Sequence, residues 1–209
     1  MRRRLACVHA LVFCVLLVSC GDPASPPARG AASLQWATST LNSKTPQCVP
    51  GPHWSNAPAA ASDQPQTSAS EAAGGFVVDG DPGSVVRCSV LQQGQGYVVK
   101  GEIRSTSPDG TLWTQVGLSV AIDGENDAQG TLYITDQQSE FTFSSDTAIV
   151  PPKPGCTFSA SAPGSQLGVG PGRLWASVQC PHVNDNRNRA AQECQIASGF
   201  IVLENCLHE

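Results

Sequence analysis

The sequence predicts an all-β domain, built as an antiparallel β-sandwich or open barrel of about eight strands and stabilised by disulfide bonds. From residue 76 onward, apolar and polar residues alternate in short runs separated by turn-forming residues, which is the pattern of strands and tight turns. Charged residues make up only 14% of the 209 residues, against 20 Gly and 16 Pro. This composition, without a convincing helical stripe in any segment, argues against a helical protein.

Each expected strand places its apolar residues at every second position, so that one face turns toward a core. In the run 112–122, Val116, Leu118 and Val120 share the apolar face, and Trp113 lies on the opposite face. In chain order the clearest runs are 84–91, 97–104, 112–122, 131–135, 140–144, 173–180 and 200–203. Together they define one β-domain over 75–209, which is large enough for a single core.

The first 19 residues read as a removable leader. Three arginines precede an apolar stretch of about fourteen residues, which is shorter than the roughly 20 that a transmembrane helix needs. The stretch ends in Leu17-Val18-Ser19-Cys20, which resembles the lipobox of bacterial lipoproteins. That resemblance implies cleavage before Cys20 and a diacylglyceryl group on its thiol. The alternative is an ordinary secretory leader, which would leave Cys20 without a lipid.

A lipid on Cys20 would anchor the protein to a membrane, stably when two or three acyl chains are attached. Gly21 stands where some lipoproteins retained in the inner membrane carry Asp, so we expect the cell envelope, and within it the outer membrane. Removing the leader leaves nine basic residues against 17 acidic residues, a net charge of −8. Such an acidic chain is a poor candidate for binding nucleic acid.

Residues 20–74 are expected to be a lipidated N-terminus followed by a tether rich in Pro, Ala and Ser. Trp36, Cys48 and Trp54 interrupt this composition, so the middle of the segment could dock on the domain. If Cys48 is tied down, the free tether is 21–47, with a coil span of about 26–31 Å.

Six cysteines remain after the leader and Cys20, and an even number in an exported chain predicts three disulfides. They are Cys48, Cys88, Cys156, Cys180, Cys194 and Cys206. Proximity in sequence favours the pairs Cys194–Cys206, Cys156–Cys180 and Cys48–Cys88. Cys88–Cys180 is the rival pair, because both residues lie on core faces of expected strands. The spacing fits no metal site, since no C-x-x-C occurs.

No constellation of residues predicts catalysis, a metal or a cofactor. The densest acidic cluster, 123–127, resembles the first half of a calcium loop, but Ala128 and Ile134 stand where Gly and Glu would be needed. A polar turn between two strands explains it better. The histidines that follow the leader, His53, His182 and His208, belong to no recognisable triad.

The aromatic residues are more informative for function. Trp113, Trp175 and Tyr133 lie among small polar residues, on the faces opposite the apolar side chains of their strands. Rings in such positions can stack on sugars or contact a protein partner. Alternatively, another part of the protein covers these rings and they are structural.

Two further resemblances concern the folded domain. The segment 77–134 resembles small lipoprotein antigens of mycobacteria, and 174–181 and 199–206 resemble the closing segments of small myxobacterial lipoproteins. They imply an envelope β-domain without known catalysis. The sequence therefore predicts a non-enzymatic, lipid-anchored binding or scaffolding protein that contacts an envelope protein. The alternatives are a carbohydrate-binding module that uses exposed Trp and an envelope hydrolase.

Overall fold

The computed structural model describes residues 25–38, 53–55, 75–107, 109–137, 140–145, 155–160, 168–185 and 193–208. Within these residues the regular structure is entirely β, as the sequence predicts. The strands are β1 (Arg29–Thr38), β2 (His53–Ser55), β3 (Val77–Val78), β4 (Ser84–Gln93), β5 (Gly96–Thr106), β6 (Trp113–Ile122), β7 (Ala128–Asp136), β8 (Phe141–Ser144), β9 (Cys156–Ser159), β10 (Gly168–Gly170), β11 (Arg173–Asp185) and β12 (Glu193–Glu204).

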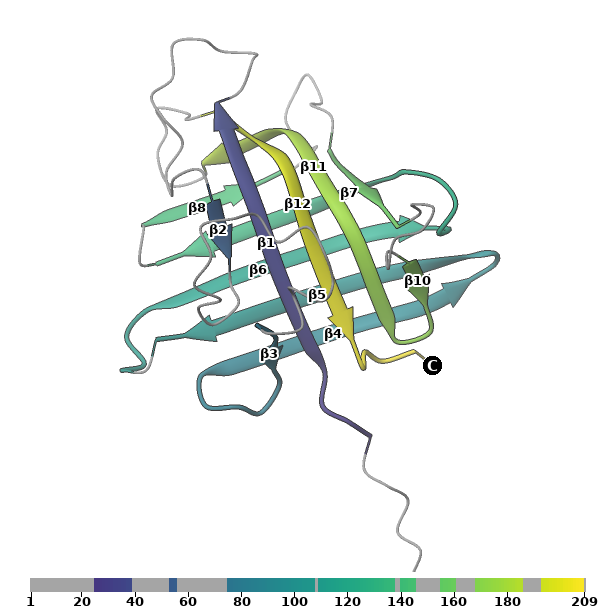
Figure 1. Ribbon diagram of the computed structural model, residues 1–209, viewed down its shortest axis with the longest axis horizontal. Coiled ribbons are helices and arrows are strands. Elements are labelled where there is room, and N and C mark those ends of the chain that lie inside the picture. The colour runs from purple at the N-terminus through teal and green to yellow at the C-terminus, as the bar shows by residue number, and fades with distance from the viewer. Residues whose placement is uncertain are drawn as a thin grey trace, which may run out of the picture.

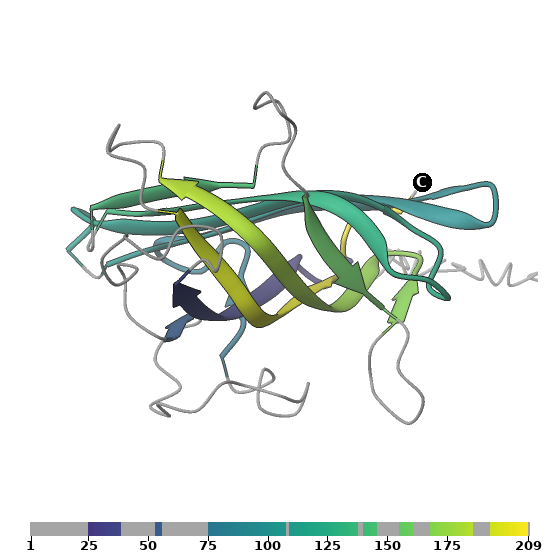
Figure 2. The ribbon, with the colours of Figure 1, turned by 90° about the horizontal axis from the view of Figure 1, so that it is seen from above.

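The strands form one antiparallel sheet in the order β2-β1-β12-β11-β8-β7-β6-β5-β4. The sheet folds over on itself, so that β1, β12 and β11 cross diagonally in front of β4 to β8 (Figure 1). Seen from above, the two halves are separate layers (Figure 2). At the fold, β9 pairs with both β11 and β7 and joins the layers.

The C-terminal tail closes the sheet into a barrel. Leu207 follows β12 and lies along the free edge of β4, where its N–H donates to the Cys88 carbonyl (3.1 Å) and its carbonyl accepts from the Val90 N–H (2.7 Å). A disulfide between Cys88 and Cys206 fixes the same contact covalently. The architecture is therefore a nearly closed barrel, one of the two forms that the sequence predicts.

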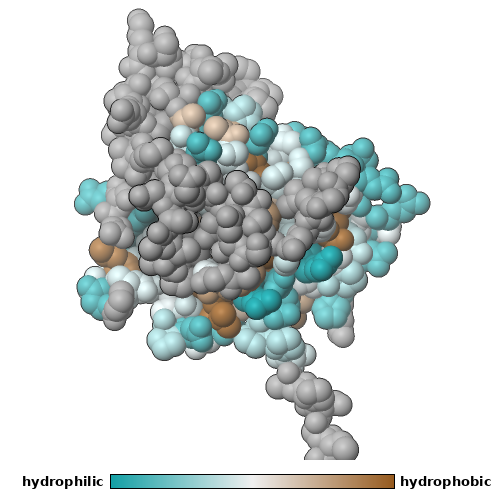
Figure 3. Space-filling model, in the orientation of Figure 1, coloured by the Kyte–Doolittle hydropathy of each residue, from teal (hydrophilic) through white to brown (hydrophobic). Residues whose placement is uncertain are grey.

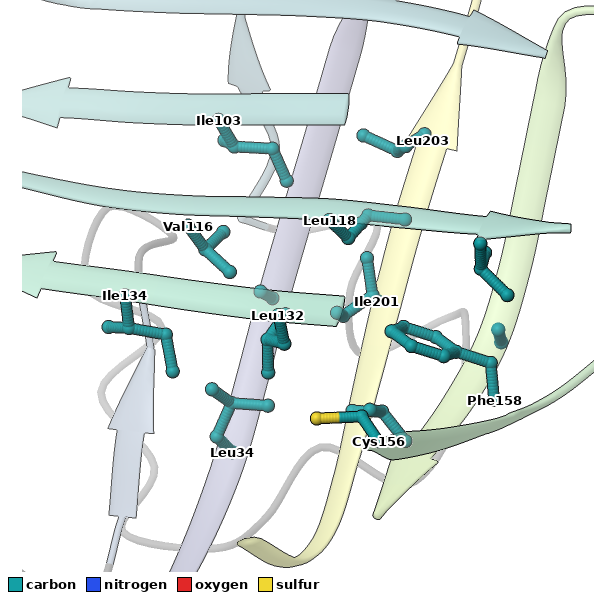
Figure 4. Packing of buried hydrophobic residues seen from close by; sticks show 14 of the residues in the cluster. Leu34, Ile103, Val116, Leu118, Leu132, Ile134, Cys156, Phe158, Ile201 and Leu203 are labelled. Atoms are coloured by element: carbon teal, nitrogen blue, oxygen red, sulfur yellow. The ribbon is translucent and has the colours of Figure 1, made fainter. Parts of the chain in front are cut away.

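The core lies between the two layers (Figure 4). Ile103, Val116, Leu118, Leu132 and Ile134 point inward from β5 to β7, and Leu34, Phe158, Ile201 and Leu203 meet them from the other side; all are at most 4% exposed. The layers approach closely at Gly101, where an added Cβ would lie 2.5 Å from Leu203 Cδ1. Alternation at period two thus supplies the core, as expected from the sequence.

The structure corrects the predicted tether, because Arg29–Thr38 is a strand of the sheet, lies between β2 and β12, and pairs with β12 over its whole length. Its inward residues include Ala32, Leu34 and Trp36, all buried. The sequence does not predict this strand because its alternation uses Ala and Ser, the residues typical of spacers. The burial of Trp36 agrees with the expectation that part of the segment docks. Cys20 and Cys48 lie outside the described residues.

The disulfides are also partly corrected. Cys156–Cys180 is present as predicted, and it joins β9 to β11. Cys88 pairs with Cys206, so the predicted pairs Cys194–Cys206, Cys48–Cys88 and Cys88–Cys180 are wrong. Cys194 is disulfide-bonded as well. Proximity in sequence does not predict the Cys88–Cys206 pair, because the tail after β12 meets β4 only when the sheet closes.

Trp36 organises an aromatic cluster inside the barrel. Its ring centroid lies 5.1 Å from that of Phe143 and 6.2 Å from that of Phe141, and both phenylalanines belong to β8. The cluster therefore ties β1, near one end of the sheet order, to the opposite layer.

We expect Trp36→Ala to lower the free energy of unfolding by about 3–5 kcal/mol, because it removes a large buried ring and leaves a cavity. Urea denaturation of the oxidised protein measures this change. Trp113→Ala is the matched control, since Trp113 is only partly buried and should lose less. Equal losses for the two variants would contradict the role of Trp36 in the core.

Candidate ligand-binding face

The sheet surface formed by β4 to β7 carries the most distinctive group of exposed side chains, and we call it the tyrosine face. It is turned upward in Figure 2, away from β1, β12 and β11. Its polar and aromatic residues, with Gly117, are Arg87, Ser89, Lys100, Glu102, Arg104, Trp113, Gln115, Gly117, Ser119, Thr131, Tyr133 and Thr135, and the apolar residues Val85, Leu91, Val98 and Ala121 lie on the same side. These residues alternate with the buried core residues of the same strands, so they belong to one outward surface.

Tyr133 lies flat on this face. It pairs directly with Gly117 of β6, and a Cβ added to Gly117 would lie 2.0 Å from Tyr133 Cζ. The ring therefore occupies the space that a side chain at position 117 would fill. Its hydroxyl accepts a hydrogen bond from Gln115 Nε2 (3.1 Å), and the residue remains 38% exposed. A fixed aromatic ring with solvent access is the result.

The environment of Tyr133 raises the pKa of its hydroxyl. Partial burial is the largest cause, because it disfavours the phenolate, and the nearby Glu102 carboxylate acts in the same direction. The hydrogen bond from Gln115 opposes this effect. The protonated phenol is thus favoured in the folded state.

We expect Tyr133 to titrate above the ordinary phenol pKa of about 10. The stability that this shift contributes is fully present below pH 10 and is lost as the pH rises through the higher pKa of the folded state. The chain has two tyrosines, so the absorbance difference between the parent and Tyr133→Phe isolates this group. A midpoint at or below 10 would contradict the proposed environment.

Basic residues gather on the same face. Of the five Lys and Arg residues in the described part of the chain, Arg87, Lys100 and Arg104 lie here, and Glu102 is the single acid among them. Arg87 is the cross-strand partner of Glu102, and the guanidinium of Arg104 stacks over the Trp113 ring at 4.7 Å. The face is therefore cationic on an acidic protein.

A shallow depression of about 470 Å³ lies between these groups. Its lining includes the basic residues Arg87 and Lys100, the hydroxyl residues Ser89 and Ser119, and Glu102, Tyr133 and Leu207. Cations, hydroxyls and one aromatic ring thus surround a single open site. The sequence indicates part of this site, because Lys100 and Glu102 form the polar side of the run 97–104. That Gly117 and Tyr133 lie beside these residues becomes visible only from the pairing of the strands.

The three aromatic residues predicted to contact a ligand do not form one site. Trp113 and Tyr133 share the tyrosine face, whereas Trp175 lies on the outward side of the opposite layer. There it packs with Phe76, Phe200 and Val202, and its Nε1 donates to Glu204 Oε1 (2.9 Å). Trp175 is therefore held in a second hydrophobic cluster. The run 200–203 signals this cluster, since it is apolar on both faces.

The free edge of β4 is covered. The N–H of Ser84 donates to the Asp81 carbonyl (2.9 Å), and that of Val86 donates to Asp79 Oδ1 (3.0 Å). Leu207 occupies the next positions along the strand, at Cys88 and Val90. Because these backbone groups already have partners, the edge of β4 from Ser84 to Val90 is not free to pair with a strand of another protein.

The acidic cluster 123–127 contains a turn built on one carboxylate. Asp123 accepts hydrogen bonds from the Glu125 and Asn126 N–H groups (2.9 and 2.8 Å) and from Asn126 Nδ2 (2.9 Å). These bonds lower the pKa of Asp123 to about 2, with the side chain of Asn126 contributing most. In the described ranges no group of three His, Cys, Asp or Glu side chains is arranged to hold a metal.

Comparison with known proteins gives no relative for this chain. No protein family, no curated protein and no solved structure matches it. In the part of the chain that the structure describes, no helix is long and apolar enough to cross a bilayer. A function must therefore be argued from the chemistry of the tyrosine face.

Proposed function

We propose that this chain is an exported, lipid-anchored protein of the bacterial cell envelope that binds an acidic polysaccharide on its tyrosine face. The observation that carries this proposal is the exposed ring of Tyr133, which lies flat over Gly117 beside Arg87 and Lys100. The protein binds the polysaccharide without converting it, so no residue is assigned a catalytic role.

The chemistry of the face suits a sugar acid. A flat aromatic ring can stack on the C–H face of a sugar, and the surrounding hydroxyl, amide and carboxylate groups can fix its orientation. Arg87 and Lys100 can pair with a sugar carboxylate, as guanidinium and ammonium groups do with carboxylates in proteins. An open, shallow site is what a long polymer requires, because its chain must continue beyond the site.

A protein partner on this face is less well supported. The core of a protein interface is typically apolar, and such interfaces occupy contiguous patches. The exposed large hydrophobic residues of the described ranges are Leu91, Leu112, Tyr133 and Leu207. Two of them, Tyr133 and Leu207, line the depression, where five charged or hydroxyl-bearing residues accompany them. The edge of β4 is also occupied from Ser84 to Val90, so a partner strand cannot pair there.

Export and anchoring rest on separate arguments. The disulfides Cys88–Cys206 and Cys156–Cys180 are typical of an oxidising compartment outside the cytoplasm. The lipid is proposed on Cys20 because Leu17-Val18-Ser19-Cys20 resembles a lipobox. Outer-membrane placement follows from Gly21 and is part of the same proposal.

Retention of oxidised residues 21–209 on immobilised polygalacturonate tests the binding proposal, with dextran as the neutral control. We expect retention on polygalacturonate, elution by salt and no retention on dextran, because charge supplies much of the attraction. Failure to bind polygalacturonate and other carboxylated polysaccharides would overturn the proposal and favour a protein partner. Equal retention on dextran would overturn the role of Arg87 and Lys100.

A further inference from the structure

The start of the described chain is fixed to the end of the barrel. Asn205 Nδ2 donates to the Pro27 carbonyl (2.9 Å), and the Asp79 N–H donates to the Ala28 carbonyl (2.8 Å). Strand β1 then begins at Arg29. The first described residues lie at the lower edge of the molecule in Figure 1 and Figure 3, below the start of β1. The chain is therefore held by the barrel from Pro27 onward.

This attachment leaves a very short connection to the proposed lipid. The inference rests on lipidation of Cys20, as set out under the proposed function. Pro26 is six positions after Cys20, so the fully extended connection between them spans at most about 20–22 Å. As a coil it spans about 12–15 Å. The lower end of the barrel must then lie close to the bilayer surface.

The surface at this end, which we call the base, suits contact with lipid headgroups. It surrounds a cavity of about 700 Å³, whose lining includes Ser25, Pro26, Arg173, Glu204, Leu207 and His208. Leu207 is 75% exposed, and Arg173 is exposed beside it. An exposed leucine can enter the boundary of the acyl chains, and an arginine can pair with phosphate.

The acid at the base is already engaged within the protein. Glu204 is the only acidic residue among those that line this cavity in the described chain. Its carboxylate accepts from Arg29, with 2.5 Å between Arg29 Nη2 and Oε2, and from Trp175 Nε1 (2.9 Å). The carboxylate that lines the cavity is therefore paired within the protein, which reduces its repulsion of phosphate groups there.

We infer that the base is a membrane-contacting surface, which seats the barrel directly on the phospholipid bilayer that holds its lipid anchor. In this position the start of β1, the end of β12 and the turn between β10 and β11 face the headgroups. The tyrosine face stands to the side of the base and stays open to a polysaccharide. Leu207 lies at the junction, since it lines both the base cavity and the depression near Tyr133.

Quenching by brominated lipids tests this inference on the full, lipidated protein in vesicles of phosphatidylethanolamine and phosphatidylglycerol. Leu207→Trp places a fluorophore at the base, and Leu112→Trp places one at another exposed leucine, before β6. We expect brominated lipid to quench the tryptophan fluorescence of Leu207→Trp more than that of the parent protein. The fluorescence of Leu112→Trp should be quenched no more than that of the parent. Circular dichroism checks that both variants fold.

Two negative outcomes are distinguishable. If mass spectrometry finds the lipid on the N-terminal peptide, and Leu207→Trp is quenched no more than the parent, the base does not contact the bilayer and the inference is overturned alone. If Cys20 carries no lipid, the anchoring in the proposed function fails and the inference fails with it. Polysaccharide binding is measured separately on residues 21–209 and is affected by neither result.

Discussion

Replacement of both Cys88 and Cys206 by alanine should lower the free energy of unfolding by about 4–5 kcal/mol. The two residues are 118 positions apart, so the bond closes a very long loop and strongly restricts the unfolded chain. It also joins the tail after β12 to the edge of β4, where Leu207 makes two backbone hydrogen bonds. Loss of the bond therefore weakens closure of the barrel as well.

Chemical denaturation of the oxidised variants measures the effect. Cys156→Ala/Cys180→Ala is the matched control, because its bond spans 24 positions and should contribute only about 3.5 kcal/mol by the same chain-entropy argument. Both double variants remove two buried sulfurs, so the cost of the cavities largely cancels in the comparison. A smaller loss for the Cys88/Cys206 variant than for the control would contradict the role of the tail in closing the barrel.

A second measurement separates the effect of barrel closure on stability from the entropic effect of the long disulfide-closed loop. If the tail leaves β4, the strand exposes unpaired backbone groups, and such an edge favours association between molecules. We therefore expect the Cys88→Ala/Cys206→Ala variant to show concentration-dependent association by light scattering. The control variant keeps the β4 edge covered and should remain unchanged.

Alternation of apolar and polar residues was sufficient to predict most of the barrel. The runs 84–91, 97–104 and 112–122 correspond to β4, β5 and β6, because each contrasts large aliphatic residues with polar ones. Strand β1 was not predicted, since alanine at positions 31 and 32 gives little contrast. Its burial depends on β12, which is more than 150 residues away in the chain. Local pattern cannot supply that information.

The candidate site was predicted only in part, for a similar reason. Periodicity places Trp113, Trp175 and Tyr133 on the outward sides of their strands, which the structure agrees with. It cannot say which strands share a layer, and Trp175 proves to lie on the opposite side of the barrel. The contact between Tyr133 and Gly117 depends on the register between β6 and β7, and the Cys88–Cys206 bond depends on closure of the barrel. Neither can be predicted from the local alternation of residues.

Removal of the Tyr133 ring should have the largest effect on polysaccharide binding. We expect Tyr133→Ala to weaken binding to polygalacturonate about tenfold, since loss of one aromatic stacking contact costs up to about 1.5 kcal/mol. Tyr133→Phe keeps the ring and loses only the hydroxyl with its hydrogen bonds to Gln115 and Glu102, so it should retain most of the affinity. Titration calorimetry on the oxidised domain compares the two. Equal weakening by both changes would show that the hydroxyl, and not the ring, makes the contact.

Substitution of Gly117 tests the orientation of the ring while leaving Tyr133 in place. Gly117→Val should weaken binding about as much as Tyr133→Ala, because even a Cβ at this position would lie 2.0 Å from Tyr133 Cζ and would lift the ring off the sheet. Valine is otherwise well suited to a strand, so the fold should persist. Gly168→Ala is a control for replacing a glycine elsewhere, since Gly168 does not have a positive φ and the nearest atom to an added Cβ there, Arg173 Nη2, lies 3.8 Å away. If Gly117→Val folds and binds normally, the flat ring is not the ligand platform, and the cationic residues alone must account for any binding.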